Sequence, residues 1–142
     1  MKSFSFRILL VVFLTLLSAC SSTSTLAGGS WQLVELDGQK LPDHITITLM
    51  LDDKMVYGSG GCNTYSGSYV QRGTKLTIRG LTSTLMACET GSNFETAYFS
   101  ALERVDTFEI TNDQLILRDA QGARRLVFIP MPQSVMTLPH II

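Results

Sequence analysis

The chain has 142 residues, 45% of them hydrophobic and 16% charged, with a formal net charge of −1. It contains no basic run and no interleaving of basic with aromatic residues, which excludes the charge pattern of nucleic-acid-binding proteins. Its three cysteines and two histidines lack the short spacing of structural zinc ligands. We therefore expect no nucleic-acid partner, no metal and no cofactor.

The N-terminus has the pattern of an export signal. Lys2 and Arg7 form a basic start, and residues 8–17 form an apolar run that is too short to span a bilayer. The run ends at Leu17-Ser18-Ala19-Cys20, which resembles the lipobox of bacterial lipoproteins. That resemblance implies that residues 1–19 are removed as a signal peptide. Two alternatives remain open: an ordinary cleaved signal in which the cysteine is incidental, and an uncleaved anchor.

The same resemblance places the mature protein in the cell envelope. Cys20 would become the lipidated, palmitate-bearing N-terminus, and several acyl chains would hold the domain permanently at the membrane. Ser21 follows the cysteine where an aspartate would indicate retention in the inner membrane, so the outer membrane is expected, with the domain on its periplasmic side. Residues 20–28 are rich in Ser and Thr and are expected to form the lipidated N-terminus and a flexible tether.

The remaining chain is short enough for one domain, and most of it has strand character. Turn residues such as Asp37-Gly38, Arg72-Gly73 and Asn112-Asp113 separate short apolar or alternating runs. Too few residues lie between the runs for crossover helices, so we expect an antiparallel sheet. Tyr57, Tyr65 and Tyr69 are expected to pack in its wall, the last two on one face. The expected strands are residues 31–36, 45–51, 55–57, 65–70, 76–78, 108–110, 115–117 and 126–129.

One segment has helical periodicity instead. Ser92 and Glu95 form a capping-box signature at its start. Residues 131–142, after the last strand, are an apolar C-terminal tail without periodicity, and we assign it no role. The apolar positions that recur at helical spacing are Phe94, Ala97, Tyr98, Ala101, Leu102 and Val105.

Two stretches carry a family resemblance. GSGGCNTYSG at residues 58–67 and STLMAC at residues 83–88 resemble the two-part signature of the META/HslJ-type, DUF306-like domain family. The resemblance covers residues 29–130 and implies a mainly β fold with one helix, a small, partly open antiparallel β-barrel. It also implies a heat-shock-associated envelope lipoprotein, but no known reaction. The motif residues with an implied structural role are Gly61, Asn63, Gly67, Thr84, Met86 and Ala87.

The two cysteines within these motifs form a candidate disulfide. Export would carry Cys62 and Cys88 into an oxidising compartment, and a bridge closing a loop of about 26 residues would stabilise the fold by roughly 3.5 kcal/mol. The alternative is two buried free thiols. The glycines before Cys62 predict a tight turn or bulge that directs it inward, and Asn63 tolerates left-handed backbone geometry.

No residue pattern indicates catalysis. His44 and His140 are placed by no motif beside a cysteine, as a thiol enzyme would need. The carboxylate pairs, Asp52 with Asp53 and Glu103 with Asp106, are interpreted as solvated charges in a turn and on the polar side of the helix. The glycine cluster is followed by neither Lys-Ser nor Lys-Thr, so a phosphate-binding loop is not indicated.

The sequence suggests three candidate functions. The favoured one is a non-enzymatic, outer-membrane-anchored lipoprotein that binds an unknown envelope protein and helps maintain the envelope under stress. The alternative is a carrier of a hydrophobic ligand or lipid, which requires a cavity in the barrel. A thiol-redox enzyme is disfavoured because the chain has no Cys-x-x-Cys pair.

Overall fold

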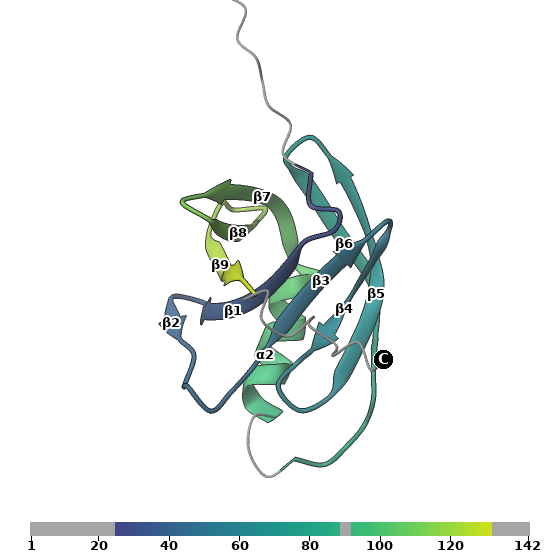
Figure 1. The fold of residues 1–142 in the computed structure, drawn as a ribbon, viewed down its shortest axis with the longest axis vertical. Coiled ribbons are helices and arrows are strands. Elements are labelled where there is room, and N and C mark those ends of the chain that lie inside the picture. The colour runs from purple at the N-terminus through teal and green to yellow at the C-terminus, as the bar shows by residue number, and fades with distance from the viewer. Residues whose placement is uncertain (1–24, 89–91, 132–142) are drawn as a thin grey trace, which may run out of the picture.

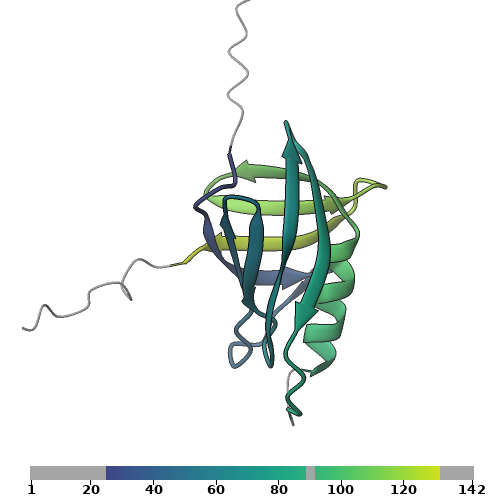
Figure 2. The same cartoon turned by 90° about the vertical axis from the view of Figure 1, so that its right-hand side faces the viewer.

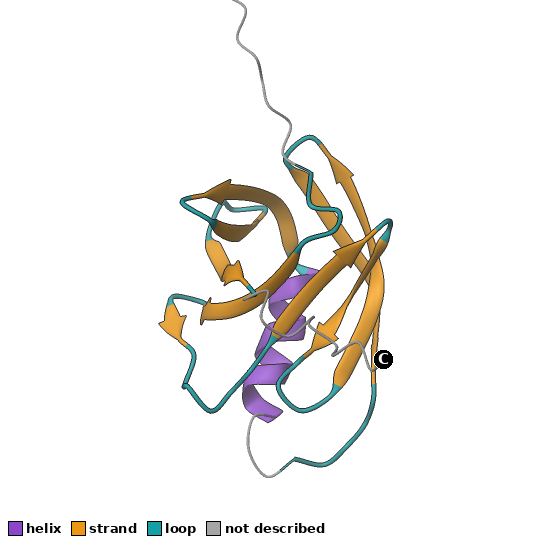
Figure 3. Ribbon diagram, viewed as in Figure 1, coloured by secondary structure: helices purple, strands orange, loops and turns teal. Residues whose placement is uncertain are grey.

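The computed structural model describes residues 25–88 and 92–131, which form a mostly β domain with one helix, α2 (Ser92–Glu103) (Figures 1 and 3). Within these ranges no helix is both long and apolar enough to cross a bilayer. The strands are β1 (Ser30–Leu36), β2 (Gln39–Lys40), β3 (Thr48–Asp52), β4 (Met55–Ser59), β5 (Thr64–Arg72), β6 (Lys75–Ser83), β7 (Val105–Thr111), β8 (Gln114–Asp119) and β9 (Arg124–Pro130).

The strands form one antiparallel sheet that closes on itself. From β3 to β9 each strand pairs with the next one along the chain, and β1 pairs with both β3 and β9. The result is an eight-stranded barrel in the described part of the chain, with β2 as an extra strand at the end of β1. The β6–β7 pairing is narrow, with a single register pair of Lys75 and Thr107. The expected fold, a small antiparallel barrel with one helix, is confirmed.

Tight turns establish the antiparallel order. Asp37 and Gly38 have φ angles of 48° and 81°, and Asn112 and Asp113 have φ angles of 49° and 60°. Positive φ at both central residues is typical of the hairpin turns whose twist matches that of the strands they join. Asn, Asp and Gly adopt this geometry more easily than other residues do. The turn pairs in the sequence therefore predict these hairpins correctly.

The helix supplies part of the barrel core. It lies against β6 and β9 (Figure 2), and its inner face buries Tyr98, Ala101 and Leu102. Tyr65 and Tyr69 are also buried, which confirms that they share the inner face of β5. The largest side chains with less than 2% exposure are Tyr98, Phe128, Leu26, Leu33, Ile47, Leu49, Leu51, Leu76, Leu102, Leu115, Leu117 and Leu126.

Several local predictions were wrong. The helical spacing extends to Val105, but the helix ends at Glu103 and Val105 begins β7. Residues 45–47 are not part of a strand, although their alternation correctly indicates which side chains are buried. Tyr57 is 39% exposed, because its position on β4 directs it to the outer face. The two-residue β2 was not predicted because Gln39 and Lys40 are polar and exposed.

The two ends of the barrel have different features. The described chain enters at the end where the β5–β6 hairpin turns, and the loop of residues 84–88 lies at the opposite end (Figures 1 and 2). Leu26, within the expected tether, is only 1% exposed, and its backbone NH donates to Oε1 of Gln71 on β5 at 3.2 Å. The chain is thus fixed to the hairpin from Leu26 onward.

Candidate functional site

The side chain of Asn63 joins the turn after β4 to the loop after β6. This residue is 5% exposed. Its Oδ1 accepts a hydrogen bond from the hydroxyl of Thr84 at 2.9 Å and another from the backbone NH of Met86 at 2.7 Å. The two sequence motifs therefore meet at one amide side chain. Asn63 does not use the left-handed geometry that asparagine tolerates, whereas Gly61 has a positive φ of 104°.

Glu95 of α2 holds the same turn from the other side. Its Oε2 accepts from the backbone NH groups of Asn63 at 2.6 Å and Cys62 at 3.3 Å, and its Oε1 accepts from Nδ2 of Asn63 at 2.7 Å. Glu95 is 9% exposed, and a buried carboxylate is costly unless donors surround it. The interpretation of Glu95 as a capping-box residue did not predict these contacts. Its spacing of three from Tyr98 and seven from Leu102 puts it on the buried face of the helix, which is the signal that could have revealed them.

Close packing explains a glycine in this turn. A Cβ atom at Gly60 would lie 2.8 Å from Oε2 of Glu95 and 2.8 Å from Cζ of Phe99. Any other residue at Gly60 would therefore force the side chains of Glu95 and Phe99 to shift, which would disturb the hydrogen bonds of Glu95 to the turn. Gly67, at the end of the same motif, lies where the β5–β6 register shifts, between Ser66 and Ser68.

The predicted cysteine pair lies at disulfide-bonding distance across the same site. The structure joins Cys62 in the turn to Cys88 at the end of the loop, with Cα atoms 6.0 Å apart. A bridged pair has no thiol for nucleophilic or redox chemistry. The disulfide and the Asn63 hydrogen bonds thus fix residues 84–88 at both ends of this segment.

This fixed loop displays apolar side chains to solvent. Leu85 is 96% exposed and Met86 is 63% exposed, and Ala87 is exposed as well. An exposed leucine alone is unremarkable, but two adjacent large apolar side chains on a cross-linked loop are typical of a contact surface. We define residues 84–88 as the apolar loop. It is the candidate functional site of the domain.

The barrel interior is filled by side chains. Tyr98 crosses its centre and contacts Tyr65 and Phe128, with ring centroids 5.6 Å and 6.5 Å away. The hydroxyl of Tyr65 donates to the carbonyl of Thr48 at 2.9 Å, so the hydroxyl of Tyr98, 2.6 Å away, donates to Tyr65. Burial raises the pKa of both tyrosines above the ordinary value. A pocket of about 90 Å³ at the edge of this cluster, lined in part by Tyr65 and Phe99, is too small for a lipid.

The structure brings none of the other titratable candidates into a site. His44, Asp52, Asp53 and Glu103 are exposed. Asp106 is on β7 and not on the helix, and its carboxylate pairs with Lys75 at 2.6 Å. Cys20 and His140 lie outside the described residues. Within those residues no group of three or more His, Cys, Asp or Glu is arranged to hold a metal.

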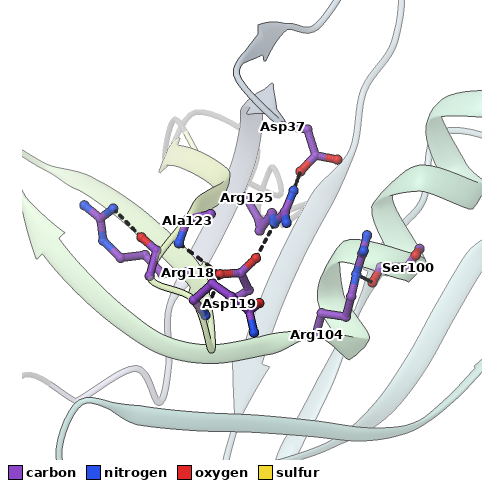
Figure 4. A network of polar contacts seen from close by, with 9 residues as sticks. Asp37, Ser100, Arg104, Arg118, Asp119, Ala123 and Arg125 are labelled. Carbon is purple, nitrogen blue, oxygen red and sulfur yellow. Dashed lines mark hydrogen bonds and ion pairs between the residues drawn. The ribbon is translucent and has the colours of Figure 1, made fainter.

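A polar network that the sequence did not reveal links three strand ends. Arg125 on β9 donates to Asp119 at the end of β8 at 2.6 Å and to Asp37 after β1 at 3.1 Å (Figure 4). Asp119 is 3% exposed and also accepts from the backbone NH groups of Gln121 and Ala123. Burial acts to raise the pKa of Asp119, but these hydrogen bonds outweigh it and hold the pKa below its ordinary value.

Comparison with known proteins agrees with this geometry. The model of the META domain matches residues 24–132. The chain belongs to the META domain family. The barrel is similar to an NMR structure of a protein from Burkholderia xenovorans, with 31% identity, a TM-score of 0.64, and coverage of 76% of this chain and 85% of that one. No curated protein matches the chain in sequence.

Two more solved structures share the fold of this META domain. One is an NMR structure with 23% identity and a TM-score of 0.61, covering 75% of this chain and 95% of the other. The second is the crystal structure of a DUF4847 family protein from Bacteroides vulgatus, with 15% identity and a TM-score of 0.56, covering 73% and 93%. At these identities the likeness concerns the fold alone, and none of these descriptions names an activity.

Proposed function

We propose that this META domain protein is a lipid-anchored component of the bacterial envelope that acts by binding another envelope protein and not by catalysis. The observation that carries the proposal is the apolar loop, in which Leu85 and Met86 are exposed while Asn63 and the disulfide hold the backbone. A preordered loop loses little conformational entropy when it binds, so its apolar side chains contribute fully to affinity.

The position of the loop supports the same proposal. The chain enters the barrel at the end opposite the apolar loop (Figures 1 and 2). An acyl anchor at Cys20 would therefore leave the loop at the membrane-distal end, directed into the periplasm. There it would contact a protein partner on the periplasmic side of the outer membrane. This contact would help to maintain the envelope under stresses such as heat.

The filled barrel argues against the carrier alternative. A carrier needs an interior cavity of several hundred cubic ångströms, whereas the centre of this barrel is occupied by Tyr98, Phe128 and leucine side chains that are less than 2% exposed. The interior is better explained as a packed core. We therefore do not propose ligand transport.

In-cell photo-crosslinking tests the proposed contact. A photoreactive amino acid at Leu85 should give one dominant protein adduct, and the same group at Ile110 on β7, also exposed, should not. Met86→Ser should weaken co-purification of the captured protein, whereas Ile110→Ser should leave it unchanged. Equal adducts from both positions, or adducts only with lipid, would contradict a protein-binding role for the loop.

The anchor is tested separately. Metabolic labelling with palmitate should modify the wild-type protein and not Cys20→Ser, and only the wild type should fractionate with outer membranes. Labelling that survives Cys20→Ser would show that the lipobox interpretation is wrong.

A further inference from the structure

The outer face of the β5–β6 hairpin carries a cluster of cations. Arg72 lies opposite Lys75 in the register of the two strands, Val70 lies opposite Thr77, and Ser68 lies opposite Arg79. Side chains of directly opposed residues lie on the same face of a sheet, and here that face is exposed. Val70, Arg72, Lys75, Thr77 and Arg79 line a shallow pocket of about 250 Å³, which we call the basic pocket.

The charges in the basic pocket are largely unneutralised. Lys75 pairs with Asp106 at 2.6 Å, but among the described residues no ion pair or hydrogen bond joins the guanidinium group of Arg72 or Arg79 to another side chain. Like charges directly opposed across two strands, as at Arg72 and Lys75, destabilise a hairpin. Because the whole chain is slightly acidic, this gathering of cations is not a consequence of composition.

The basic pocket lies at the end of the barrel where the chain enters. Leu26 is hydrogen-bonded to Gln71, the residue beside Arg72, and both views show the hairpin turn and the start of the described chain at the same end (Figures 1 and 2). The six residue-to-residue steps from Cys20 to Leu26 span at most about 20 Å even when fully extended. A membrane that holds Cys20 is therefore within reach of the hairpin.

We propose that the basic pocket binds the phosphate groups of anionic phospholipids in the membrane that carries the anchor. The planar guanidinium groups of Arg72 and Arg79 match phosphate oxygens in a bidentate geometry. Thr77 adds a hydroxyl donor, and Val70, which is 54% exposed, offers an apolar surface to the glycerol and upper acyl region. Bound in this way, the barrel stands on its hairpin and keeps the apolar loop away from the membrane.

Vesicle binding tests the proposal. It builds on the anchor proposed above, but the test does not require acylation, because it uses the mature chain from residue 20 with Cys20→Ser. The protein should bind vesicles of phosphatidylcholine mixed with phosphatidylglycerol, and should not bind phosphatidylcholine alone. Each cation near an anionic surface contributes about fivefold, so the triple variant Arg72→Gln, Lys75→Gln and Arg79→Gln should lose on the order of 100-fold in partitioning.

The matched control variant removes the same number of positive charges from other positions on the surface. This control is the triple variant Lys40→Gln, Arg118→Gln and Arg124→Gln, whose positions lie outside the hairpin. It should keep vesicle binding within a few fold of the wild type. Both triple variants should show an unchanged unfolding transition. Equal losses in the two variants would mean that only net charge matters and would overturn the site. Binding of inorganic phosphate at the same residues without vesicle binding would overturn the lipid assignment.

Discussion

The side chains of Asn63 and Glu95 are held together in the interior by a 2.7 Å hydrogen bond from Nδ2 to Oε1, and the backbone NH of Asn63 donates to the other oxygen of the same carboxylate at 2.6 Å. Through this pair the helix, the turn after β4 and the apolar loop become one unit. The backbone of the apolar loop is therefore connected to the helix through Asn63.

Asn63→Ala should lower the free energy of unfolding by about 3 kcal/mol, because it leaves Oε1 of the buried Glu95 unpaired and removes the hydrogen bonds to Thr84 and Met86. Urea denaturation under oxidising conditions would measure the loss. Asn93→Ala, at an exposed position near the start of α2, is the matched control and should change the stability by less than about 0.5 kcal/mol. Equal effects of the two substitutions would show that Asn63 has no special structural role.

The buried tyrosine hydroxyls should contribute unequally. Tyr65→Phe removes both the donor to Thr48 and the acceptor of the Tyr98 hydroxyl, so it should cost about 2 kcal/mol, whereas Tyr98→Phe removes one bond and should cost about 1 kcal/mol. Tyr57→Phe, at an exposed tyrosine, should cost almost nothing. Urea denaturation of the three variants measures the order of these stability losses. A larger loss for Tyr98→Phe than for Tyr65→Phe would contradict the assigned direction of the hydrogen bond between the two hydroxyls.

The buried pair of Tyr65 and Tyr98 predicts that the folded state is destabilised in alkali. Burial raises the pKa of Tyr65 and Tyr98 in the folded state, whereas tyrosines of the unfolded chain ionise near pH 10. The neutral form is favoured by folding, so this stability is complete below about pH 10 and is lost as the pH rises further. Tyrosinate absorbance and unfolding free energy should change together above that pH. A double Phe variant at these positions should show a shallower loss, and an unchanged slope would contradict the prediction.

Asp119 predicts that stability depends on pH in the opposite direction, in the acid range. Its pKa is held below the ordinary value in the folded state, so the stability it provides is present above about pH 4 and is lost as the pH falls through the lower folded pKa. Asp119→Asn should be less stable than the wild type at neutral pH, and the difference should narrow in acid. Asp113→Asn, in an exposed turn, is the control for removing one carboxylate. A constant difference across the acid range would rule out this linkage.

Replacing Cys62 and Cys88 together with alanine should lower the free energy of unfolding by about 3.5 kcal/mol, because the unfolded chain regains the entropy of a loop of about 26 residues. Calorimetry or urea denaturation measures the change. Reductant should destabilise the wild type by a similar amount and leave the alanine variant unaffected. If peptide mapping of the exported protein, unfolded without reductant, finds both thiols free, the bridge does not form.

Local sequence patterns predicted much of the fold. Pairs such as Asn112-Asp113 encode their own turns, and the spacing of Tyr98 and Leu102 encodes a helix face, because both signals reside in neighbouring residues. The contacts that define the site are of another kind. Glu95 contacts Asn63 across 32 residues because α2 packs against the barrel, and Arg125 contacts Asp37 across 88 residues because β9 pairs with β1.

The outward-facing features were equally inaccessible to sequence patterns. Arg72, Lys75 and Arg79 are ordinary surface cations until the β5–β6 register places them on one face. The exposure of Met86 was also not predicted, since methionine is among the residue types that are most often buried. Burial patterns identify which side chains face the core, but they do not determine which exposed side chains become neighbours.

The pairing of β1 with β9 has a consequence for when the barrel can form during synthesis. Trp31 is aligned with Pro130, so the first long strand finds its final partner only at the end of the domain. A chain that emerges from its N-terminus onward cannot complete the barrel until β9 has also emerged. The complete barrel therefore forms only after the last strand of the domain has been made.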